Sequence, residues 1–236
     1  MKKLLTFCVM ACIILTVSNS AWSNTTFIQP GPANVKDTFI WDLQDFSHAD
    51  WSGLLTNQSS IGQRILIEFT DLSAIPSGAT INSAKLGLYR YDSDPSGNPL
   101  TLDAYQITTP WAETVTYSTQ PLYNSISESS VTLSGTDPGW YEWDITNLVQ
   151  QWIDGTAANY GVAIFNHGSG YFQWFASSDN AAGIPSGTSL PPTDASYRPY
   201  LDIDFTPINA PVPGAILLGS MGTVLVGWLR KNKFFA

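Results

Sequence analysis

Apolar and polar residues alternate in short stretches along residues 24–207. Clear examples are 63–69, 84–91 and 100–107, and shorter ones follow. The positions expected to share an inward face are Ile65, Ile67 and Phe69; Leu86 and Leu88; Tyr141, Trp143 and Ile145; Val162 and Ile164; Phe172 and Trp174; and Leu201, Ile203 and Phe205. Clusters of Gly, Pro, Asn and Asp separate these stretches. A period of two interrupted by turn residues predicts an all-β fold, an antiparallel sandwich.

One segment has a helical period instead. Between Thr146 and Gly155 the apolar residues recur three or four positions apart, and Gly155 can end a helix. We predict a short amphipathic helix lying over an end of the sandwich. Trp143, Trp152 and Trp174 take core-facing positions in these patterns and are interpreted as structural.

The chain begins like an exported protein. Two lysines precede an apolar run, and small residues follow it as far as Ser23. This order is typical of a helical secretory signal peptide, removed by signal peptidase after Ser23. An uncleaved membrane anchor is the alternative, but the apolar run is short for a span. The prediction is a signal peptide at 1–23 and a folded domain at 24–207.

A second apolar segment lies near the end of the chain. Residues 208–236 comprise a Pro-rich linker, an uncharged segment at 214–229 and a basic tail. At a rise of about 1.5 Å per residue, such a helix covers about 24 Å, slightly less than a hydrocarbon core of about 30 Å. We predict a C-terminal transmembrane helix with its basic end in the cytoplasm. A buried core helix is the alternative, which the linker and the basic end disfavour.

The linker carries a motif similar to a known sorting signal. Pro211, Val212 and Pro213, followed by the apolar span and the basic end, resemble the Val-Pro variant of the PEP-CTERM signal and lack the Pro-Glu-Pro of its name. The resemblance implies recognition by an exosortase in the inner membrane of a Gram-negative bacterium that makes exopolysaccharide. It therefore implies a protein of the cell surface or the extracellular space.

Charge narrows the set of partners. The domain holds all 19 acidic residues of the chain and only five of its ten basic residues, so its net charge is −14. A domain this acidic repels nucleic acid and anionic membrane surfaces and suits an extracellular setting with divalent cations. Solubility alone is the alternative explanation. Cys8 and Cys12 lie in the signal peptide, so the mature domain has no disulfide.

Catalytic motifs are missing from the sequence of the domain. Its histidines are His48 and His167, and no His-x-His, His-Glu-x-x-His or Gly-x-Ser-x-Gly pattern occurs. Glycoside hydrolysis needs a pair of carboxylates, and no spacing among the 19 acids selects one pair. The sequence therefore indicates a protein that is not an enzyme.

Tryptophans are the strongest candidates for ligand contact. Sugars stack their C–H faces on aromatic rings, and Trp and Tyr also offer a polar handle. Trp41, Trp51 and Trp140 lie in polar, loop-like surroundings and are predicted to form a carbohydrate-binding platform. For each of them, burial as part of the packing is the alternative.

Two groups of acids are candidates for a structural calcium ion. Asp92 and Asp94 begin a segment, 92–98, that resembles the first half of an EF-hand loop, although strands rather than helices flank it. Asp37 and Asp42 belong to a second acidic group closer to the N-terminus. These four residues are the predicted Ca²⁺ ligands. An acidic hairpin loop at 92–98 is the alternative.

A series of short phrases occurs in the order typical of one family. They are Asp37–Ile40, Arg64–Phe69, Ile75–Ala79, Trp111–Glu113, Trp143–Thr146, Gln151–Trp152, Asn159–Gly161 and Arg198–Leu201. In this order they resemble the disaggregatase-related DNRLRE family of carbohydrate-binding-like domains, although the letters of that name do not occur. The resemblance covers nearly the whole domain. It implies a jelly-roll sandwich of a secreted polysaccharide-active or surface protein, a fold that often carries a structural calcium.

These patterns together predict a function. We expect an exported, non-enzymatic protein of the cell surface or extracellular matrix whose β-sandwich binds polysaccharide. The alternatives are a polysaccharide lyase or glycoside hydrolase, and a purely structural surface protein.

Overall fold

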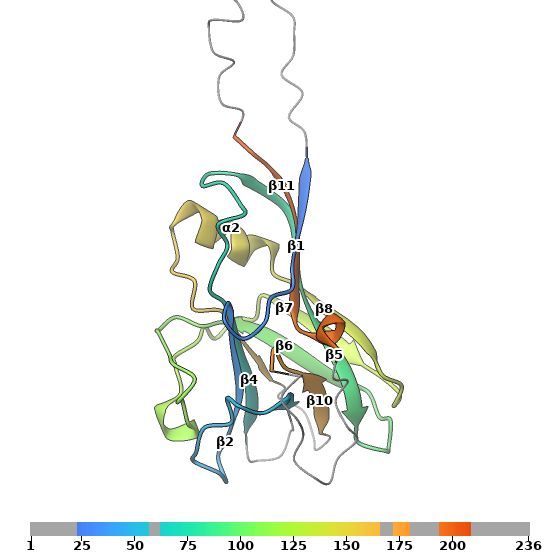
Figure 1. Cartoon of the computed structure of the whole chain (residues 1–236). Coiled ribbons are helices and arrows are strands. Elements are labelled where there is room, and N and C mark those ends of the chain that lie inside the picture. Colours follow the sequence, from blue (N-terminus) through green and yellow to red (C-terminus); the bar gives the residue numbers. More distant parts are fainter. Residues whose placement is uncertain (1–22, 57–61, 166–171, 180–193, 209–236) are drawn as a thin grey trace, which may run out of the picture. The chain divides into compact units, whose positions relative to one another are not determined.

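The computed structural model of the chain describes residues 23–56, 62–165, 172–179 and 194–208 (Figure 1). The predicted signal peptide, apart from Ser23, lies outside these residues, as do the processing motif at 211–213 and the predicted membrane segment at 214–229. Within the described part of the chain, no helix combines the length and the apolar character needed to cross a membrane.

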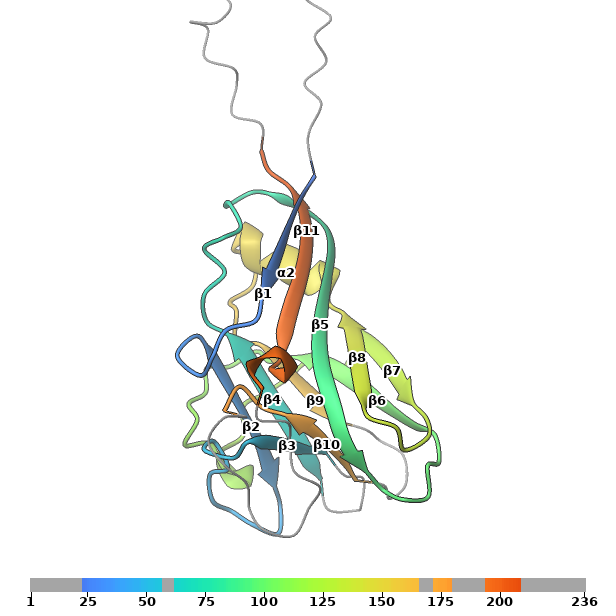
Figure 2. The ribbon, with the colours of Figure 1, turned by 45° about the vertical axis from the view of Figure 1, so that its right-hand side comes forward.

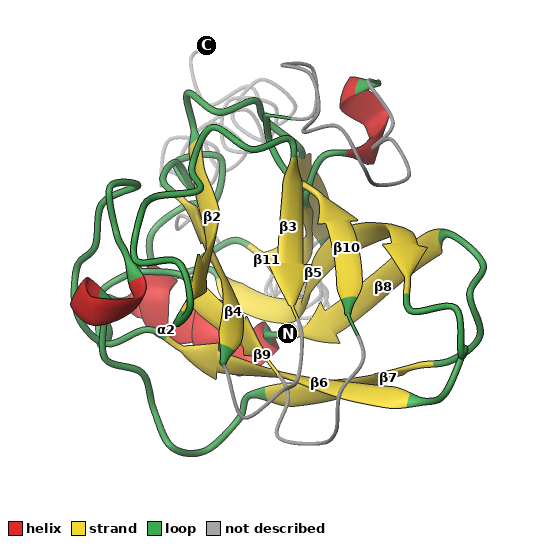
Figure 3. Ribbon diagram, turned by 90° about the horizontal axis from the view of Figure 1, so that it is seen from below, coloured by secondary structure: helices red, strands yellow, loops and turns green. Residues whose placement is uncertain are grey.

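The described strands form two antiparallel sheets that face each other (Figures 1 and 3). Sheet A has the order β1-β11-β5-β10-β3, with β8 also paired to β5. Its strands are β1 (Asn24–Ile28), β3 (Gly53–Thr56), β5 (Thr80–Ser93), β8 (Gly139–Asp144), β10 (Gln173–Ala176) and β11 (Tyr200–Thr206). Sheet B has the order β2-β4-β9-β6-β7. Its strands are β2 (Val35–Trp41), β4 (Gln63–Phe69), β6 (Leu100–Gln106), β7 (Ser129–Leu133) and β9 (Val162–Phe165). The predicted antiparallel β-sandwich is confirmed.

The core between the sheets is built from the alternating positions of the sequence. Its buried members include Ile65, Ile67 and Phe69 of β4 and Leu86 and Leu88 of β5. In β4 and β5 these alternate side chains point into the core, as the period of two predicts. Trp143 of β8 is buried in this core, and its indole N–H donates to the Leu102 carbonyl oxygen at 3.0 Å. The buried polar group therefore has a hydrogen-bond partner.

The predicted helix is confirmed as α2 (Thr146–Asp154), which packs against β5. Leu148 and Val149 are fully buried in the core. Gly155 ends the helix in the left-handed conformation, with φ of 69°, where a side chain would be strained.

The phase of β10 differs from the prediction. Phe175 points into the core, whereas Trp174 is half-buried on the opposite face of sheet A. Trp174 pairs with Asp92 and Phe175 with Arg90, so a β-bulge shifts the register at this point. The assignment of Trp174 to the core was wrong because this four-residue strand has apolar side chains on both faces, and alternation then fixes no unique phase.

The segment 92–98 is not the hairpin loop that was the alternative to a calcium loop. It begins in β5 of sheet A and leads to β6 of sheet B, so it crosses between the sheets. Gly97 takes a φ of 61° in this crossover, and its carbonyl oxygen accepts from the N–H of Gly135.

The outer face of sheet B is covered by the long connection between β6 and β7, which includes the 3-10 turn η1 (Tyr117–Thr119). A second buried cluster lies beneath this connection, where residues of the connection meet outward positions of β2, β4, β6 and β9. Its buried members are Ile40, Leu66, Tyr105, Ile107, Trp111, Val115, Ala163 and Phe165. Around β4 and β9, sheet B is therefore packed on both faces, whereas the outward Thr101 of β6 and Thr132 of β7 are exposed.

Candidate functional site

Aromatic side chains gather on the outer face of sheet A. Inward positions of its strands alternate with outward ones, and on the neighbouring strands β1, β11, β5 and β8 four outward aromatic residues are in contact. A fifth comes from the 3-10 turn η2 (Ala195–Tyr197), which precedes β11. We call these five residues the aromatic platform: Phe27, Tyr89, Trp140, Tyr197 and Tyr200. Figure 2 shows the strands that carry it, β1, β11, β5 and β8, side by side.

The rings of the platform are in continuous contact. The centroid of Tyr200 lies 4.8 Å from that of Phe27 and 4.7 Å from that of Trp140. Tyr89 continues the series, 5.4 Å from Trp140 and 4.3 Å from Tyr197. These are ordinary distances for tilted and edge-to-face pairs, so the rings hold one another in place.

A glycine lets the central ring lie against the sheet. Gly87 of β5 is paired with Tyr200 of β11. A Cβ atom at position 87 would lie 2.2 Å from Cζ of the Tyr200 ring, so any larger residue would displace that ring. Gly87 of β5 therefore leaves space on the sheet surface that the ring of Tyr200 fills.

The platform is partly open to solvent. Phe27 is 58 % exposed and Trp140 is 37 % exposed, one on each side of the nearly buried Tyr200. Contiguous exposed aromatic rings on a folded domain mark an interaction surface more often than a scattered apolar residue does. The available ring faces can take the C–H face of a sugar.

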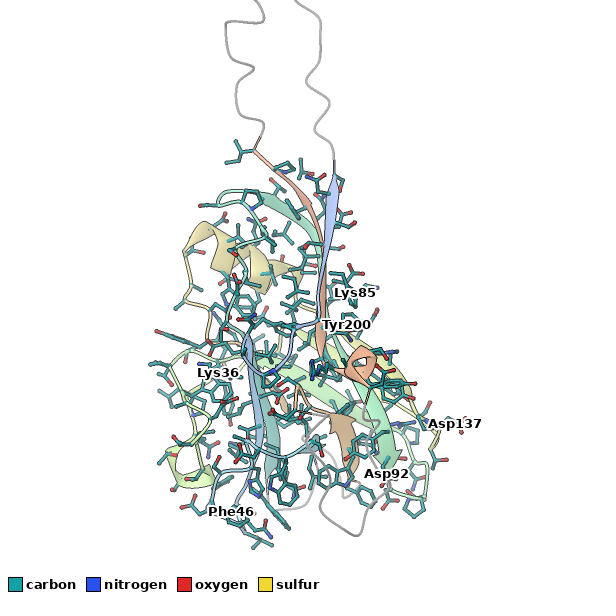
Figure 4. All side chains as sticks on the ribbon, viewed as in Figure 1. Lys36, Phe46, Lys85, Asp92, Asp137 and Tyr200 are labelled. Carbon is teal, nitrogen blue, oxygen red and sulfur yellow. The ribbon has the colours of Figure 1, made fainter. Side chains whose placement is uncertain are left out.

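Polar groups border the platform. The Tyr200 hydroxyl donates to Glu142 Oε1 at 2.6 Å, and Lys85 Nζ lies 3.0 Å from Glu142 Oε2. The hydrogen bonds from Tyr200 and Lys85 hold the pKa of the Glu142 carboxyl below its usual range, while burial raises the pKa of the Tyr200 hydroxyl. In Figure 4, Lys85 and Tyr200 lie near each other on this side of the molecule. A charged carboxylate and an ammonium group beside the rings can bind sugar hydroxyls.

A second aromatic group lies where the edge strands β2 and β3 approach each other. The His48 ring stacks on Phe39 at 4.1 Å and lies 4.5 Å from Phe46. Trp51 contacts Phe39 at 5.5 Å and lies parallel to Trp174 at 6.4 Å. We call these five residues the edge cluster. Burial lowers the pKa of the His48 imidazole, which favours its neutral form.

The structure separates the three predicted sugar-binding tryptophans. Trp140 belongs to the platform and Trp51 to the edge cluster, and no ring contact within the described residues joins the two groups. Trp41 is the half-buried last residue of β2. Trp41 and Trp140 therefore lie in strands rather than in the loop-like surroundings that the sequence suggested.

The four predicted calcium ligands are also spread over the fold. Asp37 is fully buried in β2 of sheet B, and Asp42 follows that strand, whereas Asp92 and Asp94 lie at the end of β5 in sheet A. Asp92 and Asp94 accept backbone N–H groups of their own segment, from Ser93 and Ser96. As the side chains lie in the described ranges, no three His, Cys, Asp or Glu residues are grouped closely enough to hold a metal ion.

A polar cleft lies where α2 begins. It has a volume of about 470 Å³ and is lined by Asn82, Glu128, Ser129, Asp144, Thr146 and Asn147. Burial raises the pKa of the Glu128 carboxyl, whereas hydrogen bonds from Thr146 lower that of Asp144. The two carboxylates therefore differ in proton affinity.

Sequence reasoning missed most of the platform. Tyr197 precedes the last strand, Tyr200 begins it and Phe27 lies in the first strand, and the pairing of β1 with β11 brings them together. Phe27 and Tyr200 occupy positions of their strands where alternation predicts a polar, outward-facing residue, because the neighbouring Ile28 and Leu201 face inward. The sequence signal that could have revealed the platform is an aromatic residue at an outward-facing strand position.

An antiparallel sandwich with a partly exposed aromatic face and a polar border has the architecture of a carbohydrate-binding module. The sequence profile of carbohydrate-binding module family 96 matches residues 32–186, and the chain belongs to this family. The carbohydrate-binding character that the resemblance implied is therefore shown at the level of the family. No curated protein sequence matches the chain. The matched range contains Tyr89 and Trp140 of the platform. The resemblances to the DNRLRE family and to the PEP-CTERM signal stay predictions.

Proposed function

We propose that this protein is a non-enzymatic, exported surface or matrix protein that binds polysaccharide through the aromatic platform. The observation that carries the proposal is the continuous set of rings around Tyr200, open to solvent at Phe27 and Trp140. Membership of a family of carbohydrate-binding modules supports the ligand class. Such modules bind without catalysing a reaction of their own.

The binding mode follows from the chemistry of the site. The exposed rings of Trp140 and Phe27 stack on the apolar faces of sugar units, which removes apolar surface from water. Glu142 and Lys85 accept and donate hydrogen bonds at the border. Because the platform is a face of a sheet rather than a closed pocket, it suits a chain that continues beyond the site.

Export is proposed from the ends of the sequence. A signal peptide at 1–23 and a sorting signal at 208–236 would make signal peptidase and an exosortase the processing partners, and would anchor the precursor in the inner membrane of a Gram-negative bacterium. Intact-mass measurement of the surface-associated protein tests this. A mature chain that begins after Ser23 and ends near Pro213 agrees with it, whereas a retained basic tail means that the segment is an anchor alone.

Binding is tested by migration of the full chain in native gels that contain neutral or acidic polysaccharides. At least one polysaccharide should retard the wild type. Trp140→Ala should weaken that binding roughly 10- to 100-fold, the loss expected for a central aromatic contact. Trp51→Ala in the edge cluster is the matched control and should bind like the wild type. Failure of the wild type to bind every polysaccharide in the panel would leave the purely structural role.

The second candidate function is a glycoside hydrolase or lyase. The polar cleft favours it, because Glu128 and Asp144 have pKa values shifted in opposite directions, as an acid and a nucleophile or base require. Turnover of a polysaccharide that is abolished in Glu128→Gln and kept in Trp140→Ala would establish the enzyme and refute the binding module.

A further inference from the structure

One strand joins the aromatic platform to the polar cleft beside α2. β8 carries Trp140, Glu142 and Asp144 at every second position, and the intervening Trp143 is buried in the core. Because the side chains of a strand alternate between its faces, these three residues form one row on the outer face of sheet A. Trp140 belongs to the platform and Asp144 lines the cleft. At about 3.3 Å per residue, the row that connects them covers about 13 Å.

The strands on both sides of β8 take part in this path. Lys85 of β5 is paired with Asp144, and its Nζ lies 3.0 Å from Glu142 Oε2. On the other side, Glu128 and Ser129 at the start of β7 line the cleft, and β7 lies beside β8 (Figure 2). The path therefore begins at the exposed rings and ends in a cavity.

The cleft offers hydrogen-bonding groups to a ligand. Each of the six residues that line it has a polar side chain: two amides, two carboxyl groups and two hydroxyls. Thr146 Oγ1 donates to Asp144 Oδ1 at 2.6 Å, whereas Asn147 is exposed at the start of α2. Ser129 Oγ is shielded from solvent and has no hydrogen-bond partner among the described residues. Such a lining suits a ligand with many hydroxyl groups, since an apolar ligand would leave these groups unpaired.

Charge along the path restricts the kind of sugar. Asp202 of β11 is paired with Lys85 from the side opposite to β8. The hydrogen bond and the charge of Glu142, followed by the charges of Asp202 and Asp144, raise the pKa of Lys85, so carboxylates already surround this ammonium group. Burial raises the pKa of the Glu128 carboxyl, which makes a further negative charge beside it unfavourable. A uronate or sulfate group would therefore meet like charges, whereas a sugar with hydroxyl groups alone would not.

We propose that the polar cleft is a second subsite of the polysaccharide-binding surface, and that the chain that fills both subsites is a neutral polysaccharide. The inference rests on the proposed function, because the ring of Trp140 holds one end of the chain. From this ring the chain runs along β8 past Glu142, and its next units enter the cleft. There Asn147 exchanges hydrogen bonds with the sugar hydroxyls, and the Ser129 hydroxyl gains a partner once its side chain turns towards the ligand.

Chain length tests the second subsite. The probes are a disaccharide and an octasaccharide of the neutral polysaccharide, chosen from β-glucan, mannan and xylan, that most retards the full-length protein in native gels. In calorimetric titrations the wild type should bind the octasaccharide at least roughly tenfold more tightly, since added hydrogen bonds in the cleft contribute about a factor of ten. Asn147→Ala should lose most of this gain, and Trp140→Ala should weaken both ligands. Asn124→Ala, at an exposed asparagine of the connection that covers sheet B, is the matched control and should keep the gain.

Substituent charge tests the kind of sugar. The probes are the carboxymethylated and the hydroxyethylated forms of the same polysaccharide, which differ in charge and resemble each other in bulk. At low salt the carboxymethylated form should bind the wild type roughly tenfold more weakly, and added salt should narrow the difference. Asp202→Asn removes one exposed carboxylate from the path and should strengthen binding of the carboxymethylated form by about 2- to 5-fold. Asp94→Asn, at the far end of β5, is the matched control and should bind both forms like the wild type.

A gain for the octasaccharide that survives in Asn147→Ala would overturn the second subsite, and so would shortening of the octasaccharide, which would indicate an enzyme. Equal binding of the two substituted forms would overturn the neutral ligand. Binding of anionic polysaccharides alone would overturn it too, but the proposed function would stand if Trp140→Ala abolished that binding. Failure to bind any neutral or anionic polysaccharide would instead refute the proposed function itself.

Discussion

The outer faces of sheet A and sheet B are both rich in aromatic residues, and they differ in what lies over them. On sheet B, Tyr105 and Phe165 are buried beneath the connection between β6 and β7, and Trp111 from that connection donates its indole N–H to the Tyr160 carbonyl oxygen at 2.9 Å. On sheet A, Phe27 and Trp140 keep exposed rings. The aromatic content is similar, but one face is packed and the other is available.

The difference teaches how to separate packing from function in this fold. A buried aromatic residue stabilises the domain through its apolar area and the partner of its polar atom, whereas an exposed ring contributes little to folding. Trp140 and Trp143 make the comparison within a single strand. Trp143 points into the core with no exposed surface, and Trp140 points out.

The largest expected effect comes from replacing each of these two tryptophans by alanine in a separate variant. Trp143→Ala should lower the free energy of unfolding by about 3–5 kcal/mol, since it leaves a cavity and an unpaired Leu102 carbonyl oxygen. Trp140→Ala should lower it by about 1 kcal/mol or less. Denaturant unfolding of both variants checks the pair, and similar losses would mean that the ring of Trp140 serves packing.

The second prediction concerns Asp37 at the β2 edge, whose replacement should change stability without changing sugar binding at the platform. The folded state holds the Asp37 proton up to a pKa of about 8, well above the pKa of an unfolded aspartate. The contribution of Asp37 to wild-type stability should therefore fall as the pH rises from about 4 to 8. Asp37→Asn should gain about 2–4 kcal/mol over the wild type between pH 5 and pH 8. Melting curves across this range provide the measurement, and a constant difference between the two proteins would contradict a raised pKa. Sugar binding should not change.

The third effect concerns the place that Gly87 leaves for Tyr200. Gly87→Ala should cost about 1–3 kcal/mol and weaken polysaccharide binding, because the added Cβ displaces the central ring of the platform. Gly139→Ala is the matched control, since a Cβ there meets nothing within 4 Å. If both variants bind alike, the position of the Tyr200 ring does not matter for the ligand.

The smallest effect comes from removing one hydroxyl at the border of the platform. Tyr200→Phe should lower stability by about 0.5–1.5 kcal/mol at pH 7, because Glu142 loses a hydrogen-bond donor. The pKa of Glu142 is lowered in the folded state, so its contribution is present above the unfolded pKa and is lost as the pH falls through the folded pKa. The difference between variant and wild type should therefore shrink towards acidic pH; a difference that is the same at pH 3 and pH 7 would speak against this bond.

Much of the fold could be predicted from local patterns, because each relevant signal is carried by one short segment. β4 runs from Gln63 to Phe69 as its alternation predicts, and Gly155 ends α2 as expected. Trp174 was misplaced because β10 is short and apolar on both faces, and because a bulge changes the register of β5 opposite it. A local pattern cannot reveal a bulge in a strand that lies far away in the sequence.

The sites were harder to predict than the strands, since they join distant segments. Tyr200 meets Phe27 only through the pairing of the first strand with the last. Asp37 was a predicted metal ligand, but the residues that hydrogen-bond to it, Ser178 and Glu113, lie in other segments that no spacing rule connects. Trp140 was predicted as a sugar-binding residue from its polar surroundings, and its exposure came from an outward strand position instead.

The claim that the open face of sheet A binds polysaccharide is tested most directly by comparing two exposed apolar residues on opposite faces. Trp140 lies on the platform, and Leu122, which is 67 % exposed, lies in the connection that covers sheet B. The measurement is the mobility of the full-length wild type, Trp140→Ala and Leu122→Ala in native gels with and without the polysaccharide that retards the wild type. The account predicts that Trp140→Ala loses the retardation and Leu122→Ala keeps it. Retardation that persists in Trp140→Ala and disappears in Leu122→Ala would contradict it.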